Sequence, residues 1–236
     1  MAQPGNLVKW LVCETSPGNL SLAARSVVAM ALGTERGGIA MTTSKVGARA
    51  RVRPGYGRGR EALLAAVIRV VAEGGLRNLT YRAVAREAGV AHGLVTHHFG
   101  SRDALLAAAL RYSLERSIPA LTADPGSGRI DSLFDGLAEL VEADPATQAF
   151  QFELILQARR QPELRPLVEA LYDAYRAVLR AELDLTGLDW DDDLVHLLFA
   201  ALDGLVFQQT SMGDARATQR SLTALRKVIR LLEARS

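Results

Sequence analysis

The chain has 236 residues, 49% of them hydrophobic, and a formal net charge of +2. Its one cysteine, Cys13, excludes an internal disulfide and a cysteine-rich zinc site, and it favours a reducing compartment, so we expect a cytoplasmic protein. No run of about 18 uncharged apolar residues is present, so no membrane span is expected.

The charge is divided unevenly along the chain. Residues 41–116 carry 13 Lys and Arg against 5 Asp and Glu, whereas residues 117–236 carry 12 against 19. A basic front segment followed by an acidic remainder is typical of a protein with one DNA-facing end. The simpler alternative is uneven surface charge without any partner.

Residues 1–58 show no sustained hydrophobic period. From Lys45 to Arg60, arginines and glycines alternate without an acidic residue, which predicts a disordered basic N-terminal extension. Two alternatives stay open: an arm that lies along DNA phosphates, or a solvated tail with no role. The natural chain starts at Met1 or at Met41.

Residues 59–117 predict a small helical domain. The spacing of apolar residues predicts a helix over Arg60–Glu73 that Gly74 and Gly75 end. Thr80 can N-cap the next helix, and Gly89 can end it because glycine readily takes the left-handed conformation.

A short helix at 91–97 follows, with Leu94 and Val95 expected to face inward, and Ser101 caps a further helix over Arg102–Arg116. Two short helices joined by a glycine-bearing turn predict a helix-turn-helix, whose second helix enters the DNA major groove.

Residues 118–236 form the remaining domain, in which the turn-rich segment 124–128 separates the basic front of the chain from the acidic back. From residue 129 onward the chain shows helical periodicity. Helices are expected over 130–142, from Asp144, from Pro162, over Trp190–Met212 and over 214–234. No strand pattern competes, so the predicted fold class is all-α.

The segment from Thr80 to Leu105 closely resembles the helix-turn-helix of the tetracycline-repressor-like (TetR) family of transcription regulators. The residues on the family pattern are Thr80, Ala85, Ala88, Gly89, Val90, Gly93, His98, Phe99, Ser101 and Leu105. Ala91 stands where a serine usually caps the recognition helix, Thr96 where a tyrosine usually reaches a phosphate, and Arg102 where a lysine does so.

The resemblance implies a helix-turn-helix DNA-binding domain at 59–117 and a helical effector-binding and dimerisation domain at 118–236. It implies a ligand-responsive regulator, most often a repressor, that binds a palindromic double-stranded DNA operator as a homodimer. A small hydrophobic or aromatic effector would tilt the helix at 102–116, spread the recognition helices and release the DNA.

Candidate DNA-binding residues are those expected to project from the two motif helices and their ends. They are Thr80, Tyr81, Arg82, His92, Gly93, Thr96, His97 and Arg102. By the resemblance, the candidate effector-binding residues are Phe150, Leu154, Tyr172, Tyr175, Phe199 and Asp203. The candidate dimer-interface residues are Ala200, Ala201, Gly204, Leu205 and Leu222.

Three other interpretations were weighed. A metal site at His92, His97 and His98 is disfavoured because His92 and His97 are five residues apart, not the four of helical zinc pairs. An enzyme built on Asp203, His196 or Asp191–Asp193 has no supporting motif, so no catalytic residue, metal or cofactor is expected. A helical interaction module with a degenerate DNA-binding domain stays open because of Ala91 and Thr96.

Overall fold

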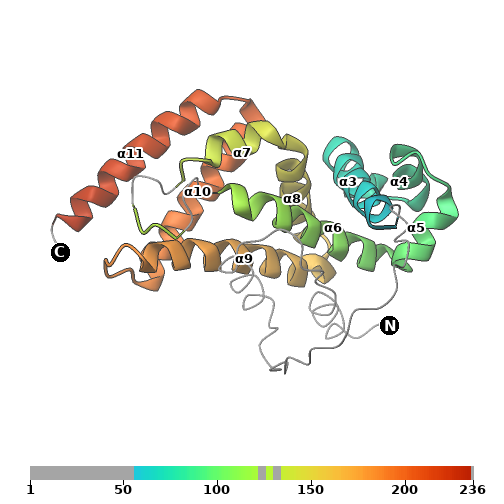
Figure 1. Ribbon diagram of the computed structural model, residues 1–236, viewed down its shortest axis with the longest axis horizontal. Helices are drawn as coiled ribbons and strands as arrows, with labels where there is room; N and C mark the ends of the chain where they lie inside the picture. The colour runs from blue at the N-terminus through green and yellow to red at the C-terminus, as the bar shows by residue number, and fades with distance from the viewer. Residues whose placement is uncertain (1–55, 122–125, 130–133, 235–236) are drawn as a thin grey trace, which may run out of the picture.

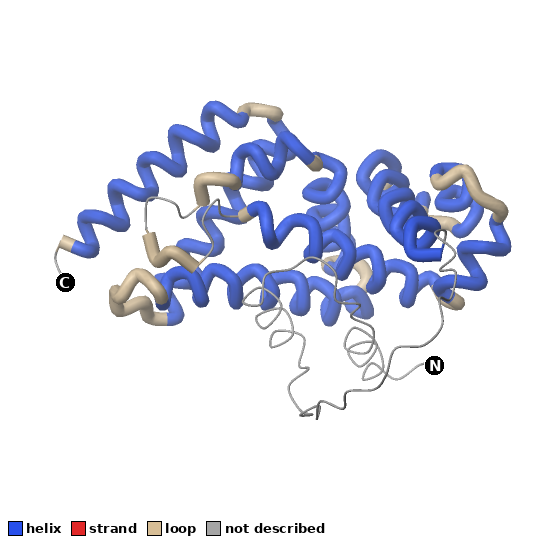
Figure 2. Tube along the Cα trace, in the orientation of Figure 1, coloured by secondary structure: helices blue, strands red, loops and turns tan. Residues whose placement is uncertain are grey.

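The computed structural model describes residues 56–121, 126–129 and 134–234, and every regular element in these ranges is helical (Figure 2). The all-α prediction is therefore confirmed for the described residues. The predictions made for residues 1–55, including the basic extension and the starting methionine, lie outside them. The first described helix already begins at Tyr56, inside the segment assigned to the extension.

Nine α-helices follow one another through the described ranges. They are α3 Tyr56–Gly74, α4 Tyr81–Glu87, α5 His92–Phe99, α6 Arg102–Ser117, α7 Leu137–Ala143, α8 Pro145–Ala158, α9 Arg165–Asp184, α10 Asp192–Met212 and α11 Ala215–Glu233. Figure 1 shows α3, α4 and α5 gathered at one end of the molecule and α11 at the other, with α6 leading from the first group into the remaining helices.

The helix boundaries follow local capping chemistry. Thr80, Ser101 and Asp191 each accept a hydrogen bond from the backbone N–H three residues later, at 3.1, 3.1 and 2.7 Å. Each bond satisfies a donor that the first helical turn leaves unpaired. Gly89 has φ 67°, which confirms the predicted left-handed end of the first motif helix.

One expected helix is shorter than its periodicity suggests. The helix expected over 130–142 is described only from Leu137, and Phe134 just before it has φ 70°. A bulky residue with positive φ does not belong to a right-handed helix. The apolar pattern therefore begins before Leu137, in residues that are not helical. Residues 130–133 lie outside the described ranges.

Two apolar clusters form the core. The first joins α3–α6 to α8 and α9, so the DNA-binding candidate region shares its core with the rest of the chain. The second packs α7, α10 and α11 against the end of α9.

Helix α6 belongs almost entirely to the first cluster, with every residue from Leu105 to Arg111 buried. A helix buried on all sides lies between two layers, so α6 physically connects the motif to the body of the protein.

Candidate nucleic-acid interface and ligand cavity

The helix-turn-helix geometry is set by a few buried side chains. Helix α5 packs through Val95 and Phe99, which are 0% and 6% exposed, and the N–H of Val90 donates to the Ala85 carbonyl at 2.9 Å across the turn. The Arg60 guanidinium lies over the Phe99 ring at 5.5 Å from its centroid. These contacts hold α5 against α3 and α4 and leave its other face to solvent.

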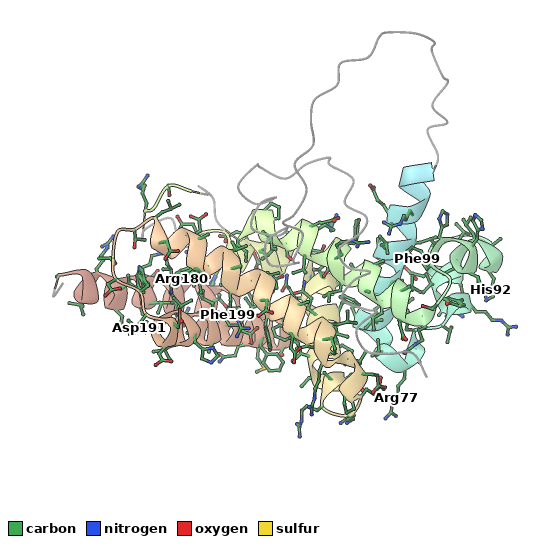
Figure 3. The ribbon with its side chains drawn as sticks, turned by 90° about the horizontal axis from the view of Figure 1, so that it is seen from below. Arg77, His92, Phe99, Arg180, Asp191 and Phe199 are labelled. Atoms are coloured by element: carbon green, nitrogen blue, oxygen red, sulfur yellow. The ribbon has the colours of Figure 1, made fainter. Side chains whose placement is uncertain are left out.

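The exposed face of α5 carries His92, Gly93, Thr96 and His97, all of which are exposed. In Figure 3 His92 lies at the opposite end of the described molecule from Asp191 and Arg180. A protruding helix with polar side chains, a glycine and exposed arginines nearby on α4 is shaped to enter a groove lined by phosphates.

The position of Leu94 differs from the one that the sequence predicts. We expected it to face inward beside Val95, but its side chain is 37% exposed. An eight-residue helix that docks through Val95 and Phe99, four residues apart, has no room on its buried face for a residue adjacent to Val95. Leu94 therefore stands on the outer side, where an apolar side chain can contact a thymine methyl group.

Two of the candidate DNA-binding residues also hold the motif together. Arg102 donates from Nη2 to the Leu76 carbonyl at 2.9 Å and from Nε to the Leu79 carbonyl at 3.4 Å. The Tyr81 hydroxyl donates to the Gly100 carbonyl at 3.2 Å, linking the start of α4 to the end of α5. The Tyr81 ring also meets His92 edge-on, with centroids 6.2 Å apart.

The remaining candidates differ in their surroundings. Arg82 is exposed on α4, while Thr80 is exposed and uses its hydroxyl oxygen as the helix cap. Ala91 precedes α5 without any side-chain cap. Burial, followed by the neighbouring charges of His97 and Arg60, lowers the pKa of His98, which keeps that half-buried ring neutral.

The body of the protein contains a cavity between α8, α9 and α10. The space in it that the centre of a water-sized molecule can reach is about 100 Å³, and its mouth is open to solvent. Its wall is mostly aromatic and aliphatic, with Tyr172 and Phe199 meeting edge-on at 5.5 Å between centroids. Figure 3 shows Phe199 in the middle of the body, well away from His92.

Four of the six candidate effector-binding residues line this cavity: Tyr172, Tyr175, Phe199 and Asp203. Phe150 and Leu154 do not, because both are fully buried in the first core cluster. Along α8 these two residues are four apart and share the face that packs on the core.

Helix α8 turns a different set of side chains toward the cavity: Gln148, Gln151, Phe152 and Ile155. Sequence reasoning missed them, although their three- and four-residue spacing was visible. The choice between the two faces of α8 depends on where α3 and α6 pack, which the periodicity of one helix does not reveal.

A buried hydrogen-bond network connects the cavity to α6. The Tyr175 hydroxyl donates to Gln151 Oε1 at 3.0 Å and lies 2.7 Å from the Ser117 hydroxyl. Gln151 Nε2 donates to the Ser113 hydroxyl at 3.0 Å. Two cavity-lining side chains are therefore bonded to two buried serines of the helix that carries the motif.

Asp203 is the carboxylate among the candidate effector-binding residues. It is half-buried on the cavity wall, and among the residues that the structure describes no hydrogen bond or ion pair reaches its carboxylate. Burial raises the pKa of its carboxyl group, because removing a carboxylate from water disfavours the charged form. Burial and the charge of Asp203 also raise the pKa of Tyr172.

The candidate dimer residues divide into two groups. Ala200 and Ala201 are exposed on α10, and Gly204 and Leu205 are half-buried there. Leu222 is fully buried within the protomer, because α11 turns it into the second core cluster, so it belongs to the core rather than to an exposed seam.

Large apolar side chains that do remain exposed on these two helices are Leu197, Phe207, Met212, Val228 and Leu231. An exposed apolar surface of this kind is typical of an interaction site.

Within the described ranges, no cluster of three or more His, Cys, Asp or Glu side chains could hold a metal ion. No described helix is both long and apolar enough to cross a membrane.

Comparison with known proteins gives two matching family models. Residues 63–109 match bacterial regulatory proteins of the tetR family, and residues 128–232 match the tetracyclin repressor-like C-terminal domain. The HTH-type transcriptional regulator BetI of Rhizobium meliloti is 30% identical over 162 residues, 64% of this chain and 77% of that protein. For BetI of Stenotrophomonas maltophilia the match is 30% identical and covers 47% of this chain and 60% of that protein.

Solved structures agree with these sequence matches. A transcriptional regulator from Rhodococcus sp. Rha1 is 27% identical with a TM-score of 0.61, covering 72% of this chain and 95% of that chain. The multidrug binding protein EbrR complexed with malachite green is 29% identical with a TM-score of 0.51, covering 70% of this chain and 96% of that chain. With both domain models, these homologues and the observed helix-turn-helix in agreement, this chain belongs to the TetR family of bacterial transcription regulators, which bind DNA and respond to ligands and are not enzymes.

Proposed function

We propose that this regulator is a repressor that binds a palindromic operator as a homodimer and leaves it when a small hydrophobic or aromatic effector fills the cavity of the body. The observation that carries the proposal is the outward face of α5, which is held by Val95 and Phe99 and is exposed among the residues that the structure describes. Operator binding implies that the protein works in the cytoplasm. No finding favours the alternative of a degenerate interaction module.

The DNA contacts divide by reach and chemistry. His92 and Gly93 begin the recognition helix and are proposed to meet base edges, because the first residues of such a helix lie deepest in the groove. Phosphate contacts are proposed for Thr80, Tyr81, Thr96, His97 and Arg102, whereas Arg82 is proposed to reach either a base edge or a phosphate. Arg102 and Tyr81 each donate a hydrogen bond to a carbonyl within the protein. They would therefore position the motif while also facing the sugar-phosphate backbone of the DNA.

Dimerisation is proposed through the exposed surfaces of α10 and α11. Ala200, Ala201 and Gly204 are small enough for close helix approach, and Leu197 and Val228 supply exposed apolar area. A two-fold dimer would present two α5 helices roughly 34–36 Å apart, one turn of duplex DNA, which is why a palindromic operator follows.

The route from effector to DNA is proposed to run through α6. An effector in the cavity lies against Tyr175 and Gln151, whose polar groups bond to Ser117 and Ser113. A ligand that competes for these hydrogen bonds shifts α6, and α6 carries the motif because Leu105 and Leu106 are buried against it. In this scheme α6 has two positions in equilibrium. Effector binding in the cavity favours one position, and DNA binding by the motif favours the other.

The test is binding of the purified full chain to the DNA upstream of its own gene, measured by fluorescence anisotropy. We expect a specific complex whose affinity falls steeply with salt, as the release of counterions requires. The matched variant carries Arg82→Ala and His92→Ala. Unchanged affinity and sequence preference in that variant would support the degenerate module instead.

A further inference from the structure

The cavity in the body carries negative charge alone. Its lining includes two carboxylates, Asp203 on α10 and Glu182 on α9, and the described lining residues contain no Lys, Arg or His. A neutral apolar ligand filling this space would strip water from a carboxylate without replacing it, which costs free energy. The charge of the lining therefore selects among ligands of equal shape.

The two carboxylates are not equivalent. Both oxygens of Glu182 accept from the Gly126 N–H, at 2.9 and 3.1 Å, at the far end of α9. Asp203 has no hydrogen bond or ion pair among the described residues, and burial raises the pKa of its carboxyl group. Asp203 is thus the lining carboxylate whose charge is left uncompensated.

Two arginines of α9, the helix that lines the cavity opposite α10, are already engaged in ion pairs. Arg176 of α9 pairs with Asp173 at 2.5 Å, and Arg180 pairs with Asp184 at 2.8 Å and with Asp192 at 3.1 Å. Neither arginine lines the cavity. A positive partner for Asp203 has to arrive from outside the described chain.

The surroundings of Asp203 suit a positive group that also has apolar bulk. Phe199 lies one helical turn before Asp203 on α10, and Tyr172 faces Phe199 edge-on. Aromatic faces attract cations, and the attraction strengthens in a partly desolvated site.

The amide of Gln148 adds a second polar contact. Gln148 lines the cavity and is 96% buried, and its Nε2 has no hydrogen-bond partner in the structure. A buried amide donor without a partner is costly, so it is expected to meet an acceptor on the bound molecule.

We propose that the effector is a hydrophobic organic cation, whose positive group lies against Asp203 and whose apolar bulk lies among the rings of Tyr172, Phe199 and Phe152. This inference rests on the proposed function, since it names the chemical class of the effector. It assigns Asp203 as the charge-selecting residue and Gln148 as the donor to any acceptor group on the ligand.

The test uses two ions of nearly equal shape and opposite charge, tetraphenylphosphonium and tetraphenylborate, with benzyltrimethylammonium as a smaller cation. Binding to the full chain is measured by calorimetry and thermal shift in the absence of DNA. We expect the cations to bind and the borate to bind at least about tenfold more weakly. Equal or tighter borate binding, or no binding of either cation, overturns the proposal.

Two variants locate the charge. Asp203→Asn is expected to weaken tetraphenylphosphonium binding about tenfold or more and to reduce the preference over tetraphenylborate, since it removes one partner of a charge pair. Glu182→Gln, the matched loss of the other lining carboxylate, is expected to change affinity less than threefold. The reverse ranking overturns the assignment of Asp203.

Failure of this inference is separable from failure of the proposed function. Because ion binding is measured without DNA, absence of any specific complex with the upstream DNA would defeat the proposed function alone. Specific DNA binding together with charge-blind ligand binding would defeat the cation inference alone.

Discussion

The two halves of α6 face their neighbours with opposite chemistry. The half that begins at Arg102 buries Leu105, Leu106 and Leu110 in an apolar core shared with α3, whereas the half that ends at Ser117 uses buried serines bonded to Gln151 and Tyr175. None of these leucines lines the cavity, whereas Gln151 and Tyr175 do, so a ligand there can compete for their hydrogen bonds. We therefore expect the motif end of α6 to be rigid and its cavity end to be the part that a ligand rearranges.

The largest effect is expected from the apolar half. Leu106→Ala removes a side chain that is 1% exposed, and we expect the free energy of unfolding to fall by about 2–5 kcal/mol, because a cavity opens between α6 and its neighbours. Chemical denaturation of the variant checks this. The matched control is Leu185→Ala, at an exposed leucine, with a change within about 0.5 kcal/mol. Equal losses in both variants would contradict the packing of α6.

The next effect tests whether the DNA-facing end acts independently of the body. Arg82→Ala is expected to weaken operator binding by about 1–3 kcal/mol, the range for loss of a specific arginine contact, without a change in thermal stability. Arg159→Ala, an equal loss of charge at the exposed end of α8, is the control. Anisotropy titrations at two salt concentrations separate the two variants, and an equal weakening by Arg159→Ala would assign the effect to overall charge.

A smaller effect is expected from the hydrogen-bonded half of α6. Tyr175→Phe removes the hydroxyl that joins Gln151 to Ser117, and the unfolding free energy should fall by about 1 kcal/mol. Because the network links the cavity to α6, the variant should also need a different effector concentration to leave DNA. If the Tyr175→Phe variant is less stable but leaves DNA at the same effector concentration as the wild type, the hydrogen-bond network does not transmit the effector signal.

The smallest effect concerns pH. The pKa of Asp203 is raised by burial above its ordinary value of 3.8, so the folded chain holds this proton where the unfolded chain has lost it. This carboxyl therefore makes the ligand-free fold less stable as pH rises from about that value through its raised pKa. The titratable groups on which its charge acts are Tyr172 and Tyr175 of α9.

Asp203→Asn should raise the melting temperature of the ligand-free protein slightly at neutral pH, because an amide carries no charge to desolvate. Differential scanning calorimetry of both proteins across this pH range measures the difference. A variant that melts lower than the wild type at neutral pH would mean that the carboxylate has a stabilising partner.

Sequence reasoning succeeded where local chemistry decides the structure. Thr80, Ser101 and Gly89 act as helix boundaries because a hydroxyl cap and a left-handed glycine need only their immediate neighbours. The order of the motif helices follows from those boundaries, and it was sufficient to indicate the family.

Sequence reasoning failed where several helices meet. Leu94 was expected to face inward and is 37% exposed, whereas Phe150 and Leu154 were assigned to the cavity wall and lie in the buried core beside it. Apolar periodicity identifies the faces of a helix but not which neighbour covers each one. The polar residues Gln148 and Gln151 were missed for the same reason, since only the packing of α6 and α9 on α8 gives them partners and a cavity.

The most direct test of the account is a DNase footprint of the purified protein on its upstream DNA, with and without tetraphenylphosphonium. We predict two protected half-sites, centred about 10 base pairs or a multiple of that apart, that disappear together when the cation is added and that His92→Ala abolishes. A single unpaired site, or protection that His92→Ala leaves unchanged, would contradict the claim that the exposed face of α5 reads DNA in duplicate.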